Sequence, residues 1–264
     1  MPPFWRDAHE RHAARNWDRF YRRNGDAFYK DRHYLERAFP EEALPPAPPP
    51  LPPPRRGRRA LLELGCGVGN AVFPLLQQNR GLYVYALDLA PSAIALLRGR
   101  RDGGGGDGAA GGGDFAERCY AEVHDAAAAD ALPCAVTAEG GVDMVMLMFA
   151  LSAVAPEKHA RVMAKAAAAL RPGGVVLFRD YGRYDEAQLR LPAHARIADN
   201  FYARADGTRA YYFDLPDVAA LAAAAGLEVL ELEAVRRRCA NRKTSAVFNR
   251  VWVHAKLRRP AAAA

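Results

Sequence analysis

A short run of glycines, flanked by two acidic residues, is the part of this sequence most suited to chemistry. The run LELGCGVGN spans residues 62–70, with Gly65, Gly67 and Gly69, and Asp88 follows the apolar run LYVYAL. Glycines let the backbone turn tightly and approach a ligand closely, because they have no Cβ. A carboxylate about 20 residues further on can accept hydrogen bonds from ribose hydroxyls. The pattern predicts a site for a cofactor that contains adenosine.

The spacing of the glycines separates two kinds of adenosine cofactor. It is G-x-G-x-G, not the G-x-G-x-x-G/A of dinucleotide-binding proteins, and Glu63 stands two residues before Gly65. A carboxylate at the end of the strand repels a pyrophosphate, whereas it attracts the ammonium and sulfonium groups of S-adenosylmethionine. We therefore predict the cofactor site of a methyltransferase rather than a dinucleotide site.

Such a site needs strands that end at one edge of a sheet. Apolar runs predict seven strands at 60–64, 82–87, 118–123, 142–148, 174–180, 227–234 and 247–256, and helical patterns fall at 69–79, 91–99, 156–170 and 214–225. This alternation predicts an α/β fold with a doubly wound, Rossmann-like, mostly parallel sheet. The last two strands predict an antiparallel hairpin at the sheet edge. Ligands of such sheets bind beyond the carboxyl ends of the strands, where we place Gly65, Asp88, Asp125, Met148 and Asp180.

Composition divides the chain into a lid, a linker and one catalytic domain. Residues 1–39 have an amphipathic helical pattern, residues 40–59 are rich in proline and arginine, and the domain spans 60–259. The linker predicts an extended polyproline spacer, which tethers the helical lid. A Gly-rich insertion at 102–114 cannot bury apolar surface, so we expect it to be disordered.

Cysteine usage and hydropathy restrict the location of the protein. The four cysteines are widely spaced and form no C-x-x-C pair, which predicts reduced thiols, no zinc site and no other metal. We see neither an apolar run of about 18 residues nor the apolar region of a signal peptide. The sequence therefore predicts no membrane association and a cytoplasmic location, with the nucleus left open as a second one.

Positive charge is concentrated near the C-terminus. The net charge is +7, and nine Lys or Arg residues fall within 236–259, whereas no Asp or Glu follows Glu233. Such a cluster fits the phosphate backbone of a nucleic acid. It fits equally a solvated edge strand whose charges discourage aggregation.

Six segments, in the same order along the chain, together resemble a known enzyme family. They are RNWDRFYRRNGDAFYKDRHYL (15–35), LELGCGVGNAVFPLL (62–76), LMFALSAVAPEK (147–158), LRPGGVVLFRDYG (170–182), NFYARADGTRAYYF (200–213) and NRVWVHAKLRR (249–259). The chain resembles the tRNA N3-methylcytidine methyltransferases, a branch of the class I S-adenosylmethionine-dependent enzymes. The resemblance implies formation of 3-methylcytidine in tRNA, at position 32 of the anticodon loop. It also implies that an aminoacyl-tRNA synthetase, such as seryl-tRNA synthetase, is sometimes a partner.

The resemblance assigns roles at the cofactor. Gly65 would contact the methionine end, Asp88 the ribose and Asp125 the adenine amino group, while Met148 would line the pocket. Asp125 has an alternative role as the cap of a helix that begins at residue 126. Trp17 and Tyr21 would fold back over the cofactor, although with Phe20 they also fit the spacing of a buried helix face. The complete predicted cofactor set is Trp17, Tyr21, Glu63, Gly65, Gly67, Gly69, Asp88, Asp125 and Met148.

The substrate would lie beside the predicted strand 174–180. Arg179, Asp180 and Tyr181 would position a cytosine flipped out of the anticodon loop, unless Arg179 and Asp180 form a structural ion pair. We expect His33 to be either an RNA contact or a surface histidine. The predicted RNA contacts are Arg32, His33, Tyr202, Arg204, Arg209, Arg236, Arg237, Arg238, Arg242 and Lys243.

The expected chemistry needs no strong base. The N3 atom of neutral cytosine has an in-plane lone pair, so alignment of the reacting atoms supplies most of the catalysis, and Asp180 would stabilise the cationic product. Cys134 follows Pro133 as in carbon-5 cytosine methylation, but it stands in a small-residue loop before the fourth strand and is not expected to be a nucleophile. Two alternatives stay open: methylation of a small molecule or protein, and a noncatalytic cofactor-binding protein.

Overall fold

The computed structural model describes residues 1–40, 58–103, 114–128, 130–138, 140–240 and 247–261. Most of the predicted linker and of the Gly-rich insertion, together with Arg242 and Lys243, lies outside the described residues. The main sheet has strands β1 (Arg59–Leu64), β2 (Leu82–Asp88), β3 (Cys119–Val123), β4 (Val142–Met148), β5 (Leu170–Tyr181), β9 (Glu228–Ala240) and β10 (Val247–Arg258). Strands β2 and β4 are buried throughout, as expected for parallel strands that are covered on both faces.

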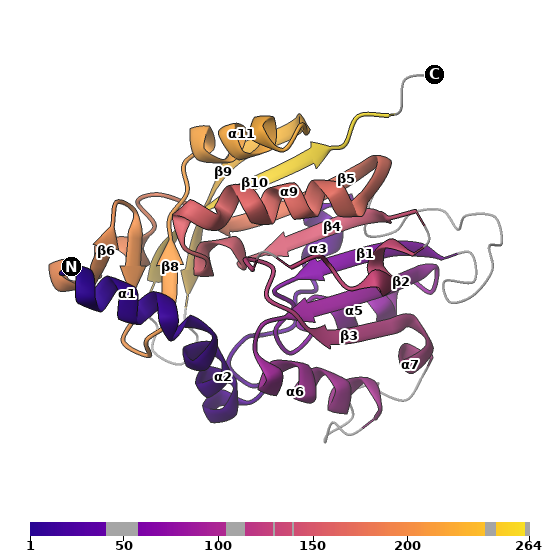
Figure 1. Cartoon of the computed structure of the whole chain (residues 1–264), viewed down its shortest axis with the longest axis horizontal. Helices are drawn as coiled ribbons and strands as arrows, with labels where there is room; N and C mark the ends of the chain where they lie inside the picture. The colour runs from indigo at the N-terminus through magenta and orange to yellow at the C-terminus, as the bar shows by residue number, and fades with distance from the viewer. Residues whose placement is uncertain (41–57, 104–113, 129, 139, 241–246, 262–264) are drawn as a thin grey trace.

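The strand order is β3-β2-β1-β4-β5-β10-β9 (Figure 1). Strands β1 to β5 run parallel, whereas β10 pairs antiparallel with both β5 and β9. The sheet is therefore mostly parallel with an antiparallel pair at one edge, as the sequence predicted. Its order reverses between β1 and β4, and ligands of open α/β sheets bind at such a reversal.

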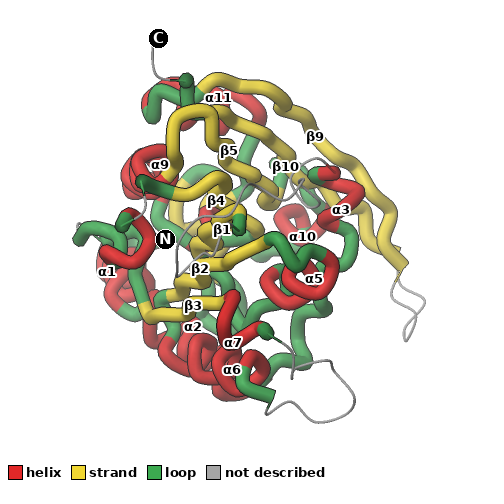
Figure 2. The backbone as a smooth tube through the Cα atoms, turned by 90° about the vertical axis from the view of Figure 1, so that its right-hand side faces the viewer, coloured by secondary structure: helices red, strands yellow, loops and turns green. Residues whose placement is uncertain are grey.

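Helices cover both faces of the sheet (Figure 2). Helices α9 (His159–Ala169) and α11 (Leu215–Ala224) pack on one face. Helices α5 (Val72–Gln78) and α6 (Pro91–Arg101) pack on the other. The remaining short helices of this domain are α7 (Phe115–Arg118), α8 (Cys134–Thr137), η1 (Leu151–Ala153), η2 (Pro156–Lys158), α10 (Glu186–Leu189) and η3 (Ala193–Ala195).

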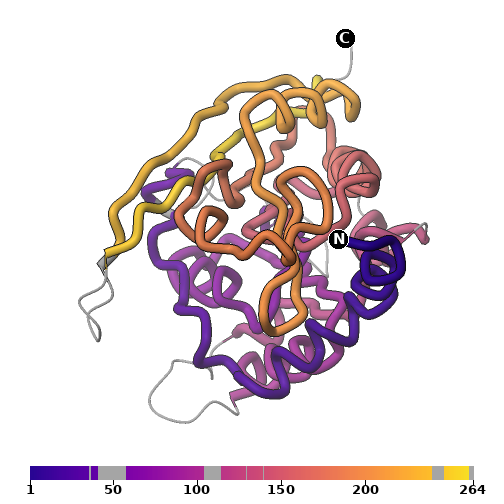
Figure 3. Tube along the Cα trace, turned by 90° about the vertical axis from the view of Figure 1, so that its left-hand side faces the viewer, coloured from indigo at the N-terminus to yellow at the C-terminus, as the bar shows by residue number. Residues whose placement is uncertain are grey.

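The N-terminal segment lies across the carboxyl ends of the parallel strands, beside a second sheet (Figure 3). This part of the segment contains α1 (Pro3–Arg11) and α2 (Ala13–Asn24), whereas α3 (Leu35–Ala38) packs on the face of the main sheet that α5 covers (Figure 2). The second sheet contains β6 (Arg196–Ala198), β7 (Phe201–Ala203) and β8 (Arg209–Tyr211). Nδ2 of Asn16 in α2 donates to the carbonyl of Gly207, 2.8 Å away. The carboxylate of Asp18 accepts from both the amide and the hydroxyl of Ser92, at 2.9 and 2.6 Å. These bonds fix α2 to the second sheet and to α6.

The structure differs from the predicted elements in several places. Strand β9 continues to Ala240 rather than ending at residue 234, α5 begins at Val72 rather than at residue 69, and Cys134 begins the short helix α8 rather than lying in a loop.

The second sheet was not predicted, because strands of three residues are too short to show a period of two. Asp206 and Gly207 lie in the turn that connects β7 to β8. Strand β5 begins at Leu170 rather than at residue 174, and the amide of Gly173 donates to the carbonyl of Arg259, 3.0 Å away. Within the described residues, no helix is long and apolar enough to span a membrane.

Candidate active site

The glycine turn after β1 is approached closely by two other segments. Gly65, Gly67 and Gly69 have φ angles of +78°, +54° and +85°, which side chains other than glycine rarely adopt. A Cβ on Gly65 would lie 2.5 Å from Cβ of Ala150, and a Cβ on Gly67 would lie 2.6 Å from the hydroxyl of Tyr21. Glycine is therefore required here for two reasons: the positive φ angles of the turn and the close approach of Ala150 and Tyr21.

Asp88 lies beneath this turn and holds it in place. Its carboxylate accepts from the amides of Gly67 and Ala90, at 2.8 and 2.9 Å. Burial raises the pKa of Asp88 to about 6, and the two amide hydrogen bonds oppose that rise. The side chain is 5% exposed and lines neither of the cavities described below. The ribose contact stays a prediction.

Glu63 is also buried beneath the site. Burial raises the pKa of Glu63 to about 8; the Arg32 charge opposes this shift and the Asp88 charge adds to it. Among the described residues, Oε2 of Glu63 has no hydrogen-bond partner. At neutral pH this side chain is mostly a neutral acid, and its attraction for a cationic cofactor group stays a prediction.

Two adjacent cavities open at the carboxyl ends of the strands, with volumes of about 230 and 310 Å³. Trp17, Gly65 and Arg209 line both of them. The first cavity lies between the ends of β1 and β3 and the turn after β4, and the second lies over the glycine turn and the start of β10. Two ligands bound in these cavities would therefore meet at the glycine turn.

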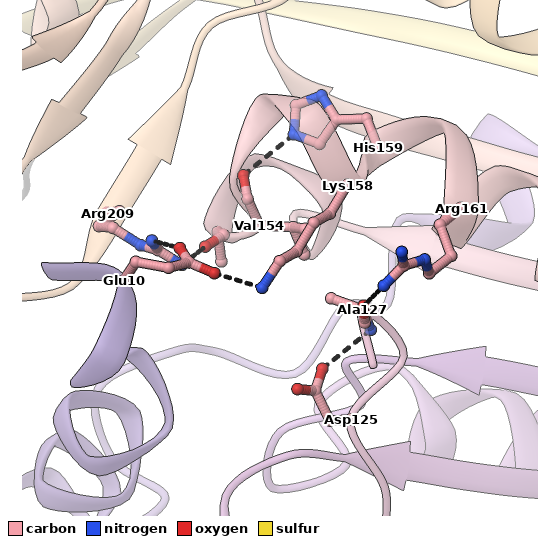
Figure 4. A network of polar contacts seen from close by, with 9 residues as sticks. Glu10, Asp125, Ala127, Val154, Lys158, His159, Arg161 and Arg209 are labelled. Atoms are coloured by element: carbon pink, nitrogen blue, oxygen red, sulfur yellow. Dashed lines mark hydrogen bonds and ion pairs between the residues drawn. The ribbon is translucent and has the colours of Figure 1, made fainter. Parts of the chain in front are cut away.

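The first cavity combines apolar walls with one exposed carboxylate. Leu89, Leu151 and Val154 contribute the apolar surface, and Asp125 stands at the rim. Oδ1 of Asp125 accepts from the amide of Ala127, 2.8 Å away (Figure 4). Residues 126–127 form a turn, and no helix begins at residue 126 among the described residues, so the predicted helix cap is wrong. A contact of Asp125 with the adenine amino group stays a prediction.

Helix α1 closes the roof of the first cavity through an ionic contact (Figure 4). The carboxylate of Glu10 pairs with Lys158 of η2 and with Arg209 of β8, and all three residues line the cavity. Arg209 also donates to the carbonyl of Ala153, 3.2 Å away. A residue from the lid is thereby joined to both the methyltransferase-like core and the second sheet.

The second cavity is lined by aromatic rings and by cations. The rings belong to Trp17, Tyr21, Tyr29, Tyr34, Phe149, Tyr181 and Trp252. The cations are Lys30, Arg32, Arg204, Arg209 and Arg250. No Asp or Glu belongs to the lining that the structure describes. Outside the lining, Asp185 pairs with Arg250 and Glu10 pairs with Arg209, whereas no ion pair of Lys30 or Arg204 is found among the described residues. Flat rings and cations suit a nucleotide, which offers a flat base and a negative phosphate.

The tripeptide Arg179, Asp180 and Tyr181 is split among three environments. Arg179 lies 4.8 Å from the Trp252 ring and 5.3 Å from the Tyr34 ring. Asp180 is fully buried, and Tyr181 lines the second cavity. No ion pair joins Arg179 to Asp180 in the described structure, so the structural alternative considered for this pair is wrong.

Asp180 has backbone partners instead of a charged one. Its carboxylate accepts from the amides of Ser152 and Tyr181, at 2.9 and 2.8 Å. Burial raises the pKa of Asp180 to about 6, and the hydrogen bonds from Ser152 and Tyr181 oppose the rise. Because the side chain is 0% exposed and lines neither cavity, Asp180 in this structure positions the turn after β4.

The predicted RNA contacts lie in different places. Arg32, Arg204 and Arg209 line the second cavity, whereas His33 is exposed and Tyr202 is half-buried, outside both cavities. The exposed residues Arg236, Arg237 and Arg238 follow one another on β9, the edge strand. The cofactor-side predictions Trp17, Tyr21 and Met148 line the second cavity as well.

Several lining residues were missed by the sequence prediction. Phe149 directly follows β4, and Trp252 pairs with Tyr181 in the antiparallel register between β10 and β5. Since β10 runs antiparallel, its beginning reaches the edge where the parallel strands end. That rule would have pointed to Arg250 and Trp252. We find no comparable sequence pattern for Glu10 or Lys158.

The chain is similar to known methyltransferases. Residues 21–232 match a protein family described as a methyltransferase domain. The chain is 40% identical over 252 residues to the tRNA N(3)-cytidine methyltransferase METTL6 of Mus musculus, covering 95% of this chain and 82% of the relative. It is 34% identical over 288 residues to the tRNA N(3)-cytidine methyltransferase METTL2 of Xenopus tropicalis, covering 98% and 82%.

Solved structures share the fold at low sequence identity. A SAM-dependent methyltransferase from Methanosarcina mazei has a TM-score of 0.57 at 16% identity and covers 81% of this chain and 100% of its own. The 1,6-didemethyltoxoflavin-N1-methyltransferase of Burkholderia thailandensis, solved with its substrate and S-adenosylhomocysteine, has a TM-score of 0.57 at 18% identity, covering 96% and 90%. The likeness supports the fold that the sequence predicted.

Proposed function

We propose that this chain, which belongs to the tRNA N(3)-cytidine methyltransferases, transfers the methyl group of S-adenosylmethionine to N3 of a cytidine in tRNA. The observation that carries the proposal is the pair of cavities that meet at Trp17, Gly65 and Arg209. A methyl transfer needs a donor and an acceptor bound side by side, with the reacting atoms aligned. The shared wall provides that arrangement.

The residues of the first cavity fit S-adenosylmethionine. At Gly65 the two cavities are separated by backbone alone, because Ala150 leaves no room for a side chain there. Trp17, Gly65 and Asp125 would hold the cofactor, and its adenine fits the apolar surface of Leu89 and Leu151. When bound, S-adenosylmethionine supplies an electrophilic methyl group attached to a sulfonium.

The residues of the second cavity would bind and orient the acceptor. Aromatic rings such as Tyr181 and Trp252 provide stacking surface, and Lys30 and Arg204 provide positive charge for the phosphates. Neutral cytosine attacks through the N3 lone pair, so no residue has to remove a proton before the transfer. Trp17 and the Glu10 contact lie over the first cavity, where they would limit the access of water to the reacting atoms.

Two further points of the proposal concern the nucleotide that is methylated and a partner protein. We propose cytidine 32 of the anticodon loop as the acceptor, because a base in a single-stranded loop can be flipped into a cavity at low cost. We also propose that seryl-tRNA synthetase assists the reaction on some tRNAs. The basic residues of β9 supply affinity for any tRNA and cannot select one.

Transfer of a labelled methyl group to total tRNA tests the function. We expect 3-methylcytidine in the nucleoside digest with the wild-type chain and none with Gly65→Ala. Because 3-methylcytidine blocks base pairing, primer extension on the product would stop at cytidine 32.

Each failure of this experiment identifies a different error. Label in a small molecule or protein but not in tRNA would support that alternative acceptor. Cofactor binding without any transfer, with and without seryl-tRNA synthetase, would support a noncatalytic binder. A stop at another nucleotide would overturn only the proposed position.

A further inference from the structure

The turn after β4 contains an aromatic residue in a strained backbone conformation. Phe149 has a φ of +57°, and among the described residues only Tyr184 and Asn200 are other non-glycine residues with positive φ. Tyr184 is 65% exposed, and neither it nor Asn200 lines a cavity. Strained conformations persist where the surroundings enforce them, and they gather at functional sites. Phe149 is the one of the three that lines the second cavity.

Neighbouring contacts enforce the conformation of Phe149. Its amide donates to the carbonyl of Arg179 in β5, 2.8 Å away. The next residue, Ala150, packs against Gly65, where no Cβ would fit. The turn is thus held between β5 and the glycine turn, and it directs the Phe149 ring into the second cavity next to the wall that both cavities share.

Packing of the protein interior does not explain this ring. Phe149 belongs to none of the hydrophobic core clusters of the described residues and is partly exposed. Its ring centroid lies 5.1 Å from that of Tyr181, and it meets the Trp252 ring edge to face at 6.1 Å. These two rings hold the orientation of Phe149 in the second cavity.

A flat cation occupies the ring face in this structure. The guanidinium carbon of Arg32 lies 5.0 Å from the Phe149 centroid, and Nη1 of Arg32 donates to the carbonyl of Met148, 3.3 Å away. A base stacked between the ring and the guanidinium would need about 3.5 Å on each side, and hence about 7 Å between the two groups. The observed separation of 5.0 Å is too small for a base. A base that stacks on this face must displace Arg32.

We propose that Phe149 is the platform on which the acceptor cytosine stacks, and that Arg32 covers this face until the base enters. This inference rests on the proposed function, which it deepens by naming the residue that fixes the plane of the base. Phe149 is adjacent to the shared wall of the two cavities. A base stacked there has its ring plane set by the strained turn, and its N3 edge can point toward the first cavity.

Substitutions that separate ring stacking from apolar bulk test the platform. Phe149→Leu keeps an apolar side chain and removes the flat ring, whereas Phe149→Tyr keeps the ring. Loss of one stacking contact is expected to lower kcat/KM for tRNA about 10- to 100-fold in Phe149→Leu, with cofactor affinity changed less than about threefold. Phe149→Tyr should stay within about fivefold of the wild type. Tyr184→Leu, a matched aromatic residue with positive φ outside both cavities, should not change kcat/KM.

A binding measurement makes the test independent of turnover and of small losses in stability. The probe is a tRNA whose acceptor cytidine is replaced by fluorescent pyrrolocytidine, whose emission falls when it stacks on an aromatic ring. Quenching should occur with the wild type and Phe149→Tyr, and it should be absent with Phe149→Leu at a temperature where that variant is folded.

Three results would overturn the proposal that the acceptor cytosine stacks on Phe149. They are unchanged kcat/KM in Phe149→Leu, equal losses in the Leu and Tyr variants, and quenching that persists in Phe149→Leu. A wild-type chain that forms no 3-methylcytidine would instead overturn the proposed function, so the two failures are distinguishable.

Discussion

Replacing Glu10 by glutamine removes the ionic contact that joins helix α1 to the roof of the first cavity. Glu10 pairs with Lys158 and Arg209, and the three side chains are 33%, 37% and 6% exposed. No residue of α1 is buried, so the helix has little apolar packing to hold it against the core. We therefore expect the closed position of α1 to depend mainly on this contact and on the connection to α2.

The size of the effect follows from the exposure of the two partners. The pair with the half-exposed Lys158 contributes at most about 1 kcal/mol. The bond to the buried Arg209 is a hydrogen bond between charged groups, which contributes roughly 1.5 kcal/mol or more, and Arg209 keeps the carbonyl of Ala153 as a partner. A combined loss of about 2 kcal/mol lowers the closed population about 30-fold relative to the open one.

The corresponding assay is the dissociation rate of S-adenosylhomocysteine, measured by stopped-flow displacement. If the cofactor leaves through the opened roof, Glu10→Gln should raise this rate by up to about 30-fold. Asp7→Asn is the matched control, because it removes the same charge from an exposed position on the same helix. Dissociation rates that are equal in the wild type and Glu10→Gln would refute the reasoning, as would an equal increase in Asp7→Asn.

The pH dependence provides a second check on the same contact. Burial raises the pKa of Glu10, whereas the hydrogen bonds and charges of Lys158 and Arg209 together lower it by more than burial raises it. The resulting pKa of Glu10 lies below the ordinary 4.5. A carboxyl with a lowered pKa stabilises the folded contact above its ordinary pKa, and the stabilisation is lost as the pH falls through the lowered value. The difference between wild type and Glu10→Gln should therefore be constant from about pH 6 to 8.

Three further predictions concern other parts of the molecule. Gly65→Ala should abolish cofactor binding in calorimetry and lower Tm, because its Cβ would lie 2.5 Å from a neighbouring Cβ, while Gly99→Ala, with open space around it, should leave both unchanged. Glu63→Gln should melt near the wild-type temperature at pH 5 and gain relative stability up to pH 8, because the raised pKa of about 8 makes the wild type lose stability over that range; parallel melting curves would contradict the assignment. Replacing Arg236, Arg237 and Arg238 together by serine should lower tRNA affinity in anisotropy titrations. The slope of log K against the logarithm of the salt concentration should become less steep by about 2, and an unchanged slope would favour a solvated edge strand.

The parts of the fold that could be predicted are local in the sequence. Apolar runs such as 82–87 and 142–148 show buried parallel strands directly, and the glycine turn is a contiguous pattern of residues. The fold, the family and the cofactor class are confirmed for this reason. The ribose contact of Asp88 and the adenine contact of Asp125 stay predictions, because in this structure both carboxylates accept hydrogen bonds from backbone amides.

The second cavity could be predicted only in part, because it depends on register between distant segments. Tyr34, Phe149 and Trp252 come from the lid, the turn after β4 and the start of an antiparallel strand. Each looks like an ordinary apolar residue in the sequence. They meet because Trp252 pairs with Tyr181 and because the lid packs over the site. The antiparallel direction of β10 points to the first of these, whereas the packing of the lid leaves no pattern in the sequence.

The placement of the acidic residues bears on how the reaction is catalysed. Glu63, Asp88 and Asp180 are all buried beneath the two cavities, and burial raises the pKa of each. None of them lines the described part of the second cavity, whose charged groups are all cations. A reaction that had to deprotonate its acceptor would need a base in that cavity. Cytosine N3 does not, so the arrangement fits catalysis by orientation, in which the carboxylates shape the turns and the rings and cations hold the nucleotide.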